Sequence, residues 1–153
     1  MEDRLFCEYR FKFYLNASHS ILINGRQGAV HPHTWEFTLD ILVPRNEFKE
    51  FNSYEQSPAD FFAQYQNITI NDLSPFDTIV PTLENMVEYF GDELRKIIRN
   101  DGGELLRIEG SETPTRSYII SYDRRSDYMD PMEDNSKVAL DKMLEKMLDD
   151  ILA

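Results

Sequence analysis

The sequence predicts an α+β fold in which a long antiparallel strand pair precedes two helices and two shorter strands. Residues 4–18 and 33–43 alternate apolar and polar side chains, which is the period of a half-buried strand. Residues 83–98 place their apolar side chains at helical spacing instead. The predicted order is therefore strand, strand, helix, helix, strand, strand, followed by one more helix at the C-terminal end.

The composition favours a folded protein that binds neither nucleic acid nor a membrane. Hydrophobic residues make up 41% of the 153 residues, enough for one core. The net charge of -12 repels phosphate backbones and anionic lipid. No apolar run approaches the roughly 20 residues that span a bilayer, and the charged first residues are unlike a signal peptide. The single cysteine, Cys7, fits a reducing compartment, so we expect a cytoplasmic protein.

The first two strands are predicted to pair with one face covered. In the first strand the apolar residues take the odd positions from Leu5 to Ala17, and His19 continues this parity. In the second strand, Trp35 to Val43 alternate in the same way. A turn at Asn24–Gly28 joins the strands, which predicts an antiparallel pair.

Helix signals follow the strand pair. Residues 47–65 lack a clean period, but Ser57 and Pro58 resemble an N-cap followed by proline at the first helical position, which predicts a short helix from Pro58 to Tyr65. The second helix is predicted to begin after Thr82, a suitable N-cap, and to stop at Asn100–Gly103.

The remaining chain is predicted to form two strands, a linker and a helix. The strands cover Glu104–Ser111 and Arg116–Tyr122. Residues 123–136 are polar and acidic, typical of a linker, and a striped helix runs from Lys137 to Leu152. We therefore expect a domain of residues 1–122 and a region of residues 123–153 made of the linker and an amphipathic helix. The stripe must find an apolar partner, either the protein's own sheet or another subunit.

All three histidines, His19, His31 and His33, fall close together in the chain. His31 and His33 share one face of a strand, about 7 Å apart. His19 ends the neighbouring strand, so the three imidazoles can converge on one ion, although a histidine considered alone is more often a packed or surface residue than a ligand. Three nitrogen ligands with a free fourth position are typical of catalytic zinc, and iron or nickel would also accept them.

These motifs resemble the 6-pyruvoyl-tetrahydropterin synthase and 6-carboxytetrahydropterin synthase family, whose pattern is matched from residue 4 to about residue 122. The matching residues are Ala17-Ser18-His19, Asn24–Gly28, His31-Pro32-His33, Ile70-Asn71, Pro81–Asn85 and Glu112-Thr113. The resemblance implies the tunnelling fold, in which subunits of ββααββ order join into a trimeric barrel, commonly stacked as a hexamer. We therefore expect a homo-oligomer that carries an extra C-terminal helix.

The resemblance also implies a zinc cofactor and a pterin substrate. His19, His31 and His33 would bind the zinc, and the substrate would be dihydroneopterin triphosphate or a related pterin. Glu112 would anchor the pterin, because a carboxylate can accept two parallel N–H bonds from a planar donor pair. Without the resemblance, Glu112 reads as a solvated turn residue.

The catalytic positions of the family are changed in this chain. The family's cysteine base is matched by Gln27, and its Asp-His pair is matched by Gln66 and Asn67. An amide has no titrating proton near neutral pH and cannot act as the base. Cys7 is predicted to be a small buried residue at the far end of the first strand, away from the histidines.

Three functional hypotheses follow. The first is a zinc-dependent carbon–oxygen lyase of the pterin synthase type, with Glu36, Asp72, Glu84 or the metal site itself supplying the base. The second is a non-catalytic relative that retains zinc and pterin as a binding or assembly module. The third is a structural homo-oligomer in which the metal only fixes the strand ends.

Overall fold

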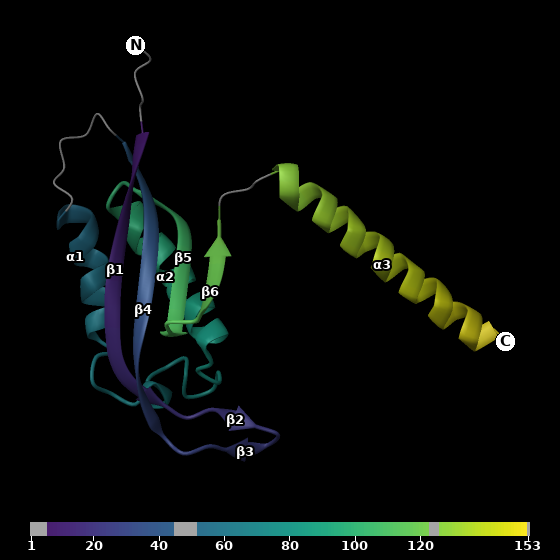
Figure 1. The fold of residues 1–153 in the computed structure, drawn as a ribbon, viewed down its shortest axis with the longest axis horizontal. Coiled ribbons are helices and arrows are strands. Elements are labelled where there is room, and N and C mark those ends of the chain that lie inside the picture. Colours follow the sequence, from purple (N-terminus) through teal and green to yellow (C-terminus); the bar gives the residue numbers. More distant parts are fainter. Residues whose placement is uncertain (1–5, 45–51, 123–125, 153) are drawn as a thin grey trace, which may run out of the picture. The chain divides into compact units, whose positions relative to one another are not determined.

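The computed structural model describes residues 6–44, 52–122 and 126–152 (Figure 1). Residues 4–5 of the predicted first strand and residues 123–125 of the predicted linker lie outside the described residues. The chain divides into two compact units, Met1–Tyr122 and Asp123–Ala153, which are described separately below.

The first unit has the predicted α+β architecture. Its four-stranded antiparallel sheet has the order β1-β4-β5-β6. The strands are β1 (Phe6–His19), β4 (His31–Pro44), β5 (Glu104–Thr113) and β6 (Arg116–Ser121). A small hairpin of β2 (Leu22–Ile23) and β3 (Arg26–Gln27) continues the β1–β4 connection. Asn24 and Gly25 adopt φ of 50° and 76° between its strands, as a tight hairpin turn of this type requires.

The core lies between the sheet and the helices α1 (Asn52–Ala63) and α2 (Leu83–Asn100), both behind the strands in Figure 1. Trp35, Phe37 and the odd-numbered residues that follow them in β4 are buried, as the alternating pattern predicts. The Phe37 ring packs against Phe62 of α1 and Phe90 of α2, with centroids 5.0 and 5.3 Å away. This aromatic layer fixes which face of β4 is inward.

The structure corrects the predicted start of α1. The helix covers Asn52–Ala63, so Pro58 lies inside it, and the prediction of Pro58 as its first residue was wrong. Tyr54, Pro58 and Phe62 are all buried, at a spacing of four residues that places them on one helix face. Burial of this stripe outweighs the hydrogen bond that a proline cannot donate.

Helix α2 begins and ends where the sequence predicts. The Thr82 hydroxyl accepts a hydrogen bond from the Asn85 backbone N–H at 3.2 Å, which confirms Thr82 as the N-cap. Beyond the C-terminal end, Gly102 adopts a φ of 91°. Gly110 of β5 leaves no room for a Cβ beside Val87, so the helix packs closely against the strand that carries Glu112. A short 3-10 helix, η1 (Ile70–Asp72), precedes α2.

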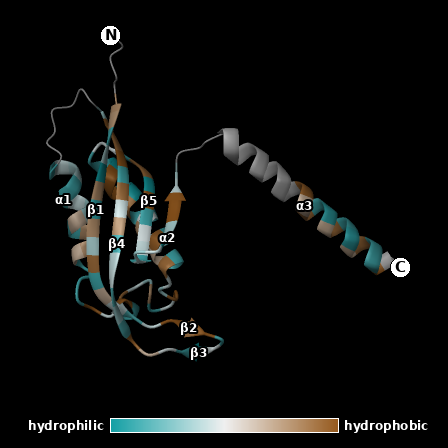
Figure 2. Ribbon diagram, in the orientation of Figure 1, coloured by the Kyte–Doolittle hydropathy of each residue, from teal (hydrophilic) through white to brown (hydrophobic). Residues whose placement is uncertain are grey.

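The second unit consists of α3 (Ser126–Leu152). It begins eleven residues before the predicted start at Lys137, so the prediction that residues 126–136 form a linker was wrong. Acidic residues are favourable in the first turn of a helix, where the backbone dipole is positive, and acidity is therefore no evidence for a linker. The later turns of α3 alternate apolar and polar residues (Figure 2). Among the described residues, no helix is both long and apolar enough to cross a bilayer.

The Thr82 cap predicts a measurable contribution to stability. Replacing Thr82 with alanine should lower the free energy of unfolding by about 1 kcal/mol, because the Asn85 N–H then has no side-chain acceptor. Thr82→Ser is the matched control, since it keeps the hydroxyl. Chemical denaturation of both variants gives the comparison, and equal losses in the two would contradict the assignment.

The exposed stripe of α3 predicts a packing partner on the exterior of the oligomer or on a second ring. Its apolar residues are about half exposed or more: Leu140, Met143, Leu144, Met147, Leu148 and Ile151. Truncation after Asp134 removes the stripe and should lower the melting temperature or reduce the size of the assembly. Light scattering after size exclusion and a thermal melt measure both, with Lys142→Ala as a control. A truncated chain that matched the full chain in both would argue against a partner.

Candidate functional site

The three histidine side chains converge at one end of the sheet. Their ligand nitrogens all lie within 4.8 Å of one another, and the Nε2 atoms of His19 and His31 are 2.9 Å apart. The strand register explains this convergence, because His19 pairs directly with His31 and Ala17 pairs with His33. His19 is completely buried, whereas His31 and His33 are partly exposed.

Two backbone carbonyls determine which nitrogens face the centre of the cluster. Nδ1 of His19 lies 2.8 Å from the Pro81 carbonyl oxygen, and Nδ1 of His31 lies 3.0 Å from that of Ala29. A carbonyl only accepts hydrogen bonds, so each Nδ1 carries the proton and each Nε2 presents a lone pair. Two lone pairs that face each other repel unless a cation lies between them. These histidines therefore suit a metal ion, with the orienting contacts that metal-bound histidines usually have.

The protonation of His19 also suits a metal ligand. Burial lowers the pKa of the His19 imidazole below its ordinary value of 6.5, and this effect exceeds the opposing influence of the Pro81 carbonyl and the Glu112 carboxylate. A neutral imidazole is the form that binds metals. A metal ion can therefore bind His19 near neutral pH without first displacing a proton from its ligand nitrogen.

The predicted anchor Glu112 lies directly beside the histidines. Its Oε1 atom is 3.5 Å from Nε2 of His19 and 3.7 Å from Nε2 of His33. The same oxygen accepts a hydrogen bond from the indole N–H of Trp35 at 3.1 Å. The alternating pattern predicts Trp35 only as a core residue and does not predict this hydrogen bond. A buried indole usually finds an acceptor for its N–H, and that requirement was the available signal.

Glu112 borders two cavities that bring in the candidate bases. A cavity of about 250 Å³ is lined by Thr82, Glu84 and Arg116 as well as Glu112. A second, of about 340 Å³, is bordered by Glu112 and Glu36, but Glu36 is paired with Lys12 at 3.2 Å. The third candidate base, Asp72, is exposed on η1. Glu84 is therefore the candidate that shares a cavity with Glu112 and has no ion pair among the described residues.

The amides at the family's catalytic positions make hydrogen bonds within the protein. The Gln27 side chain donates to the Ser20 hydroxyl. Gln66 donates to the Tyr14 carbonyl at 2.8 Å and accepts from the Asn16 N–H at 2.9 Å, which ties it to β1. An amide supplies a strong donor and a strong acceptor at once, whereas an ionised carboxylate only accepts. These contacts position the chain and transfer no proton.

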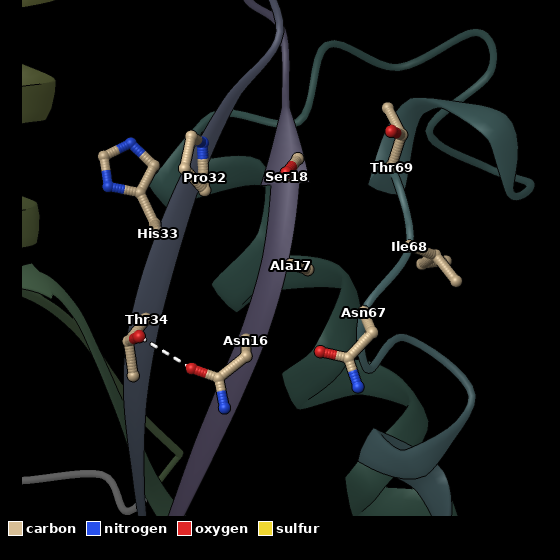
Figure 3. A pocket seen from close by; sticks show the side chains of 9 residues that line it. All are labelled: Asn16, Ala17, Ser18, Pro32, His33, Thr34, Asn67, Ile68 and Thr69. Atoms are coloured by element: carbon tan, nitrogen blue, oxygen red, sulfur yellow. Dashed lines mark hydrogen bonds between the residues drawn. The ribbon is translucent and has the colours of Figure 1, made fainter.

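Asn67 lines a polar cavity of about 530 Å³ that His33 also borders (Figure 3). The cavity lies between the β1 and β4 ends and residues 67–69, and Figure 3 shows the His33 ring directed away from Asn67. Asn67 also donates its backbone N–H to the Asn16 carbonyl at 2.6 Å. Cys7, partly buried, pairs with Val43 at the opposite end of β1, roughly 40 Å along the strand from His19.

The chain is similar to a known protein family. A family model described as 6-pyruvoyl tetrahydropterin synthase matches residues 8–123. The chain belongs to this family. The predicted family membership and tunnelling fold are therefore confirmed, while assembly into a barrel stays a prediction. No curated protein shows significant similarity to the chain.

Solved structures agree with the family's fold. The Caenorhabditis elegans 6-pyruvoyl tetrahydropterin synthase is 14% identical, with a TM-score of 0.66 over 80% of this chain and 100% of that one. The Plasmodium falciparum synthase is 13% identical, with a TM-score of 0.58 over 76% and 98%. An uncharacterized protein, WS1659 of Wolinella succinogenes, is 14% identical, with a TM-score of 0.57 over 78% and 100%. At such low identity these likenesses support the fold alone.

Trp35 provides a direct test of metal binding in this pterin synthase family member. It is the single tryptophan of the chain, and its ring centroid is 4.9 Å from that of His19 and 5.1 Å from that of His33. Titration with Co²⁺ should quench its fluorescence and saturate at one ion per chain. His31→Ala should require at least about tenfold more cobalt, because a direct ligand is lost. Thr38→Ala, on the same strand, is the control, and identical curves for His31→Ala and the wild type would exclude the histidine site.

Proposed function

We propose that the protein is a zinc-dependent, pterin synthase-like carbon–oxygen lyase that acts on dihydroneopterin triphosphate or a related pterin. The convergence of three imidazole nitrogens beside the Glu112 carboxylate is the observation that carries this proposal. Family membership supports the pterin as ligand. Zinc is the preferred ion, because three histidine ligands and a free fourth position are typical of catalytic zinc sites.

His19, His31 and His33 would hold the ion, and the Pro81 and Ala29 carbonyls would keep the first two rings oriented. When bound, zinc polarises a hydroxyl or carbonyl group next to a carbon that must lose a proton. His31 and His33 are partly exposed, so the substrate's side chain would approach the ion from their side of the cluster.

Glu112 would bind the heterocycle from the cavity that it shares with Thr82 and Glu84. The pyrimidine edge of a pterin presents two parallel N–H donors, and a carboxylate accepts such a pair well. The Trp35 indole N–H would hold the carboxylate in place from the buried side. Substrate recognition would thus come from a carboxylate whose position is fixed by the core.

Glu84 is the best-placed candidate for the missing base. The Gln27 amide donates to Ser20 and does not titrate near neutral pH, so it cannot act as the base. Glu84 borders the same cavity as Glu112. A carboxylate in this role has a parallel in a Plasmodium vivax 6-pyruvoyltetrahydropterin synthase, in which a glutamate is named as a catalytic residue. A carboxylate at the substrate can accept the proton that a cysteine or histidine accepts elsewhere.

We also propose that the protein forms a homo-oligomer, as a trimer or hexamer. β1 and β6 are the outer strands of the sheet, and unpaired edges of this kind readily pair with another chain. The competing function is a non-catalytic zinc- and pterin-binding relative. The hydrogen-bonded amides at Gln27 and Gln66 favour it, because they replace proton-transfer groups with structural contacts. A purely structural metal remains the third hypothesis.

Incubation with dihydroneopterin triphosphate separates the three hypotheses. The zinc-loaded wild type should change the pterin fluorescence and release triphosphate, and His33→Ala should lose this turnover because a zinc ligand is removed. Thr38→Ala should retain it. Pterin binding without turnover would favour the non-catalytic relative, and zinc without pterin affinity would favour the structural role.

A further inference from the structure

We propose that Glu112 is itself a ligand of the metal ion while no pterin is bound, so that the ion and the pterin share one carboxylate. The inference rests on the proposed function, because it takes the metal and the pterin to occupy this site. It adds a coupling between the two ligands that neither the histidines nor the cavity alone would create.

The arrangement of acceptors around the cluster carries the inference. Nε2 of His19 and Nε2 of His31 present lone pairs, since their Nδ1 atoms donate to carbonyls. Oε1 of Glu112 faces Nε2 of His19 at 3.5 Å. A carboxylate oxygen and an unprotonated nitrogen both carry negative charge density and repel each other at this separation. Nε2 of the buried His19 therefore has two other acceptors close to it, and this arrangement calls for a cation among them.

Two of the separations at Glu112 are close to those between ligands of one ion. Zinc ligands at about 2.0–2.1 Å in a tetrahedral site lie about 3.3–3.4 Å from one another. Oε1 of Glu112 is 3.5 and 3.7 Å from Nε2 of His19 and His33, close to this value. A carboxylate oxygen is also a common zinc ligand. Glu112 thus stands at ligand spacing from two of the three histidines.

Trp35 keeps Oε1 turned toward the histidines. The indole N–H donates to this oxygen at 3.1 Å, and the Trp35 side chain is fully buried and held by its neighbours. Ligand carboxylates commonly receive such a hydrogen bond from an outer group. The Glu112 side chain is 24% exposed, so it also reaches the cavity where a pterin would lie. Oε1 of Glu112 therefore faces the proposed ion position, while the Glu112 side chain also borders the cavity proposed for the pterin.

The shared carboxylate has a regulatory consequence. Four protein ligands would close the coordination sphere at rest, and a pterin that takes both carboxylate oxygens would open it. The ion would then meet substrate hydroxyls only when the heterocycle is correctly bound. Because coupling between two ligands is reciprocal, a pterin without side-chain hydroxyls should weaken zinc binding, and zinc should weaken that pterin equally.

Zinc affinity, measured by competition with a chromophoric chelator, tests the proposal. Glu112→Gln should bind zinc at least about tenfold more weakly than the wild type, since a charged ligand is replaced by a neutral amide. Glu109→Gln is the matched control. Glu109 lies on the same strand as Glu112 and borders the cavity of about 340 Å³ with it, but it pairs with Arg107 at 3.5 Å. Equal zinc affinity in Glu112→Gln and the wild type would overturn the inference.

A second measurement needs no variant. In the cobalt-loaded wild type, 6-unsubstituted pterin should change the visible absorption bands of the ion, because Glu112 leaves the coordination sphere. Unchanged bands at pterin saturation would overturn the inference and leave the proposed function standing. A wild-type protein that binds neither zinc nor pterin would instead overturn the proposed function, and the shared carboxylate with it.

Discussion

The site depends on the convergence of unprotonated nitrogens and a carboxylate oxygen on one small volume. This arrangement follows from the pairing of β1 with β4, which sets His19 opposite His31 and places His33 beside Ala17. A shift of one residue in that pairing would turn each side chain of one strand to the other face. The register of two strands therefore decides whether the imidazoles can share an ion.

The hydrophobic core enforces this register. Trp35, Phe37 and the following odd residues of β4 are fully buried, so a slipped strand would expose them and bury Glu36 and Thr38 instead. Full burial of one large apolar side chain contributes about 1.5–3 kcal/mol, which makes the slip very costly over several residues. The start of α2 adds a second constraint, because the Pro81 carbonyl that orients His19 directly precedes the Thr82 cap. Fold stability and site geometry thus rest on the same contacts.

The sequence predicts those parts of the molecule that a local period or a cap encodes. Strand alternation and the Thr82 cap identified β1, β4 and α2, and strand parity alone placed the histidines on one face. The starts of α1 and α3 were missed because proline and acidic residues were taken as boundaries, whereas packing and the helix dipole accept them. A buried indole needs an acceptor, but the sequence could not identify Glu112 as that acceptor, because the contact depends on the register between β4 and β5.

The chemistry of the site is best understood from what the amides replace. Gln27 donates to the Ser20 hydroxyl, and Gln66 both donates to and accepts from the backbone of β1, so these two amides make structural contacts where the family has proton-transfer groups. By contrast, Nε2 of His19 lies close to Nε2 of His31 and to Oε1 of Glu112, and these acceptors repel one another unless a cation lies among them. An ion held among these groups, as proposed above, would remove this repulsion, and it would then act on whatever the adjoining cavity admits.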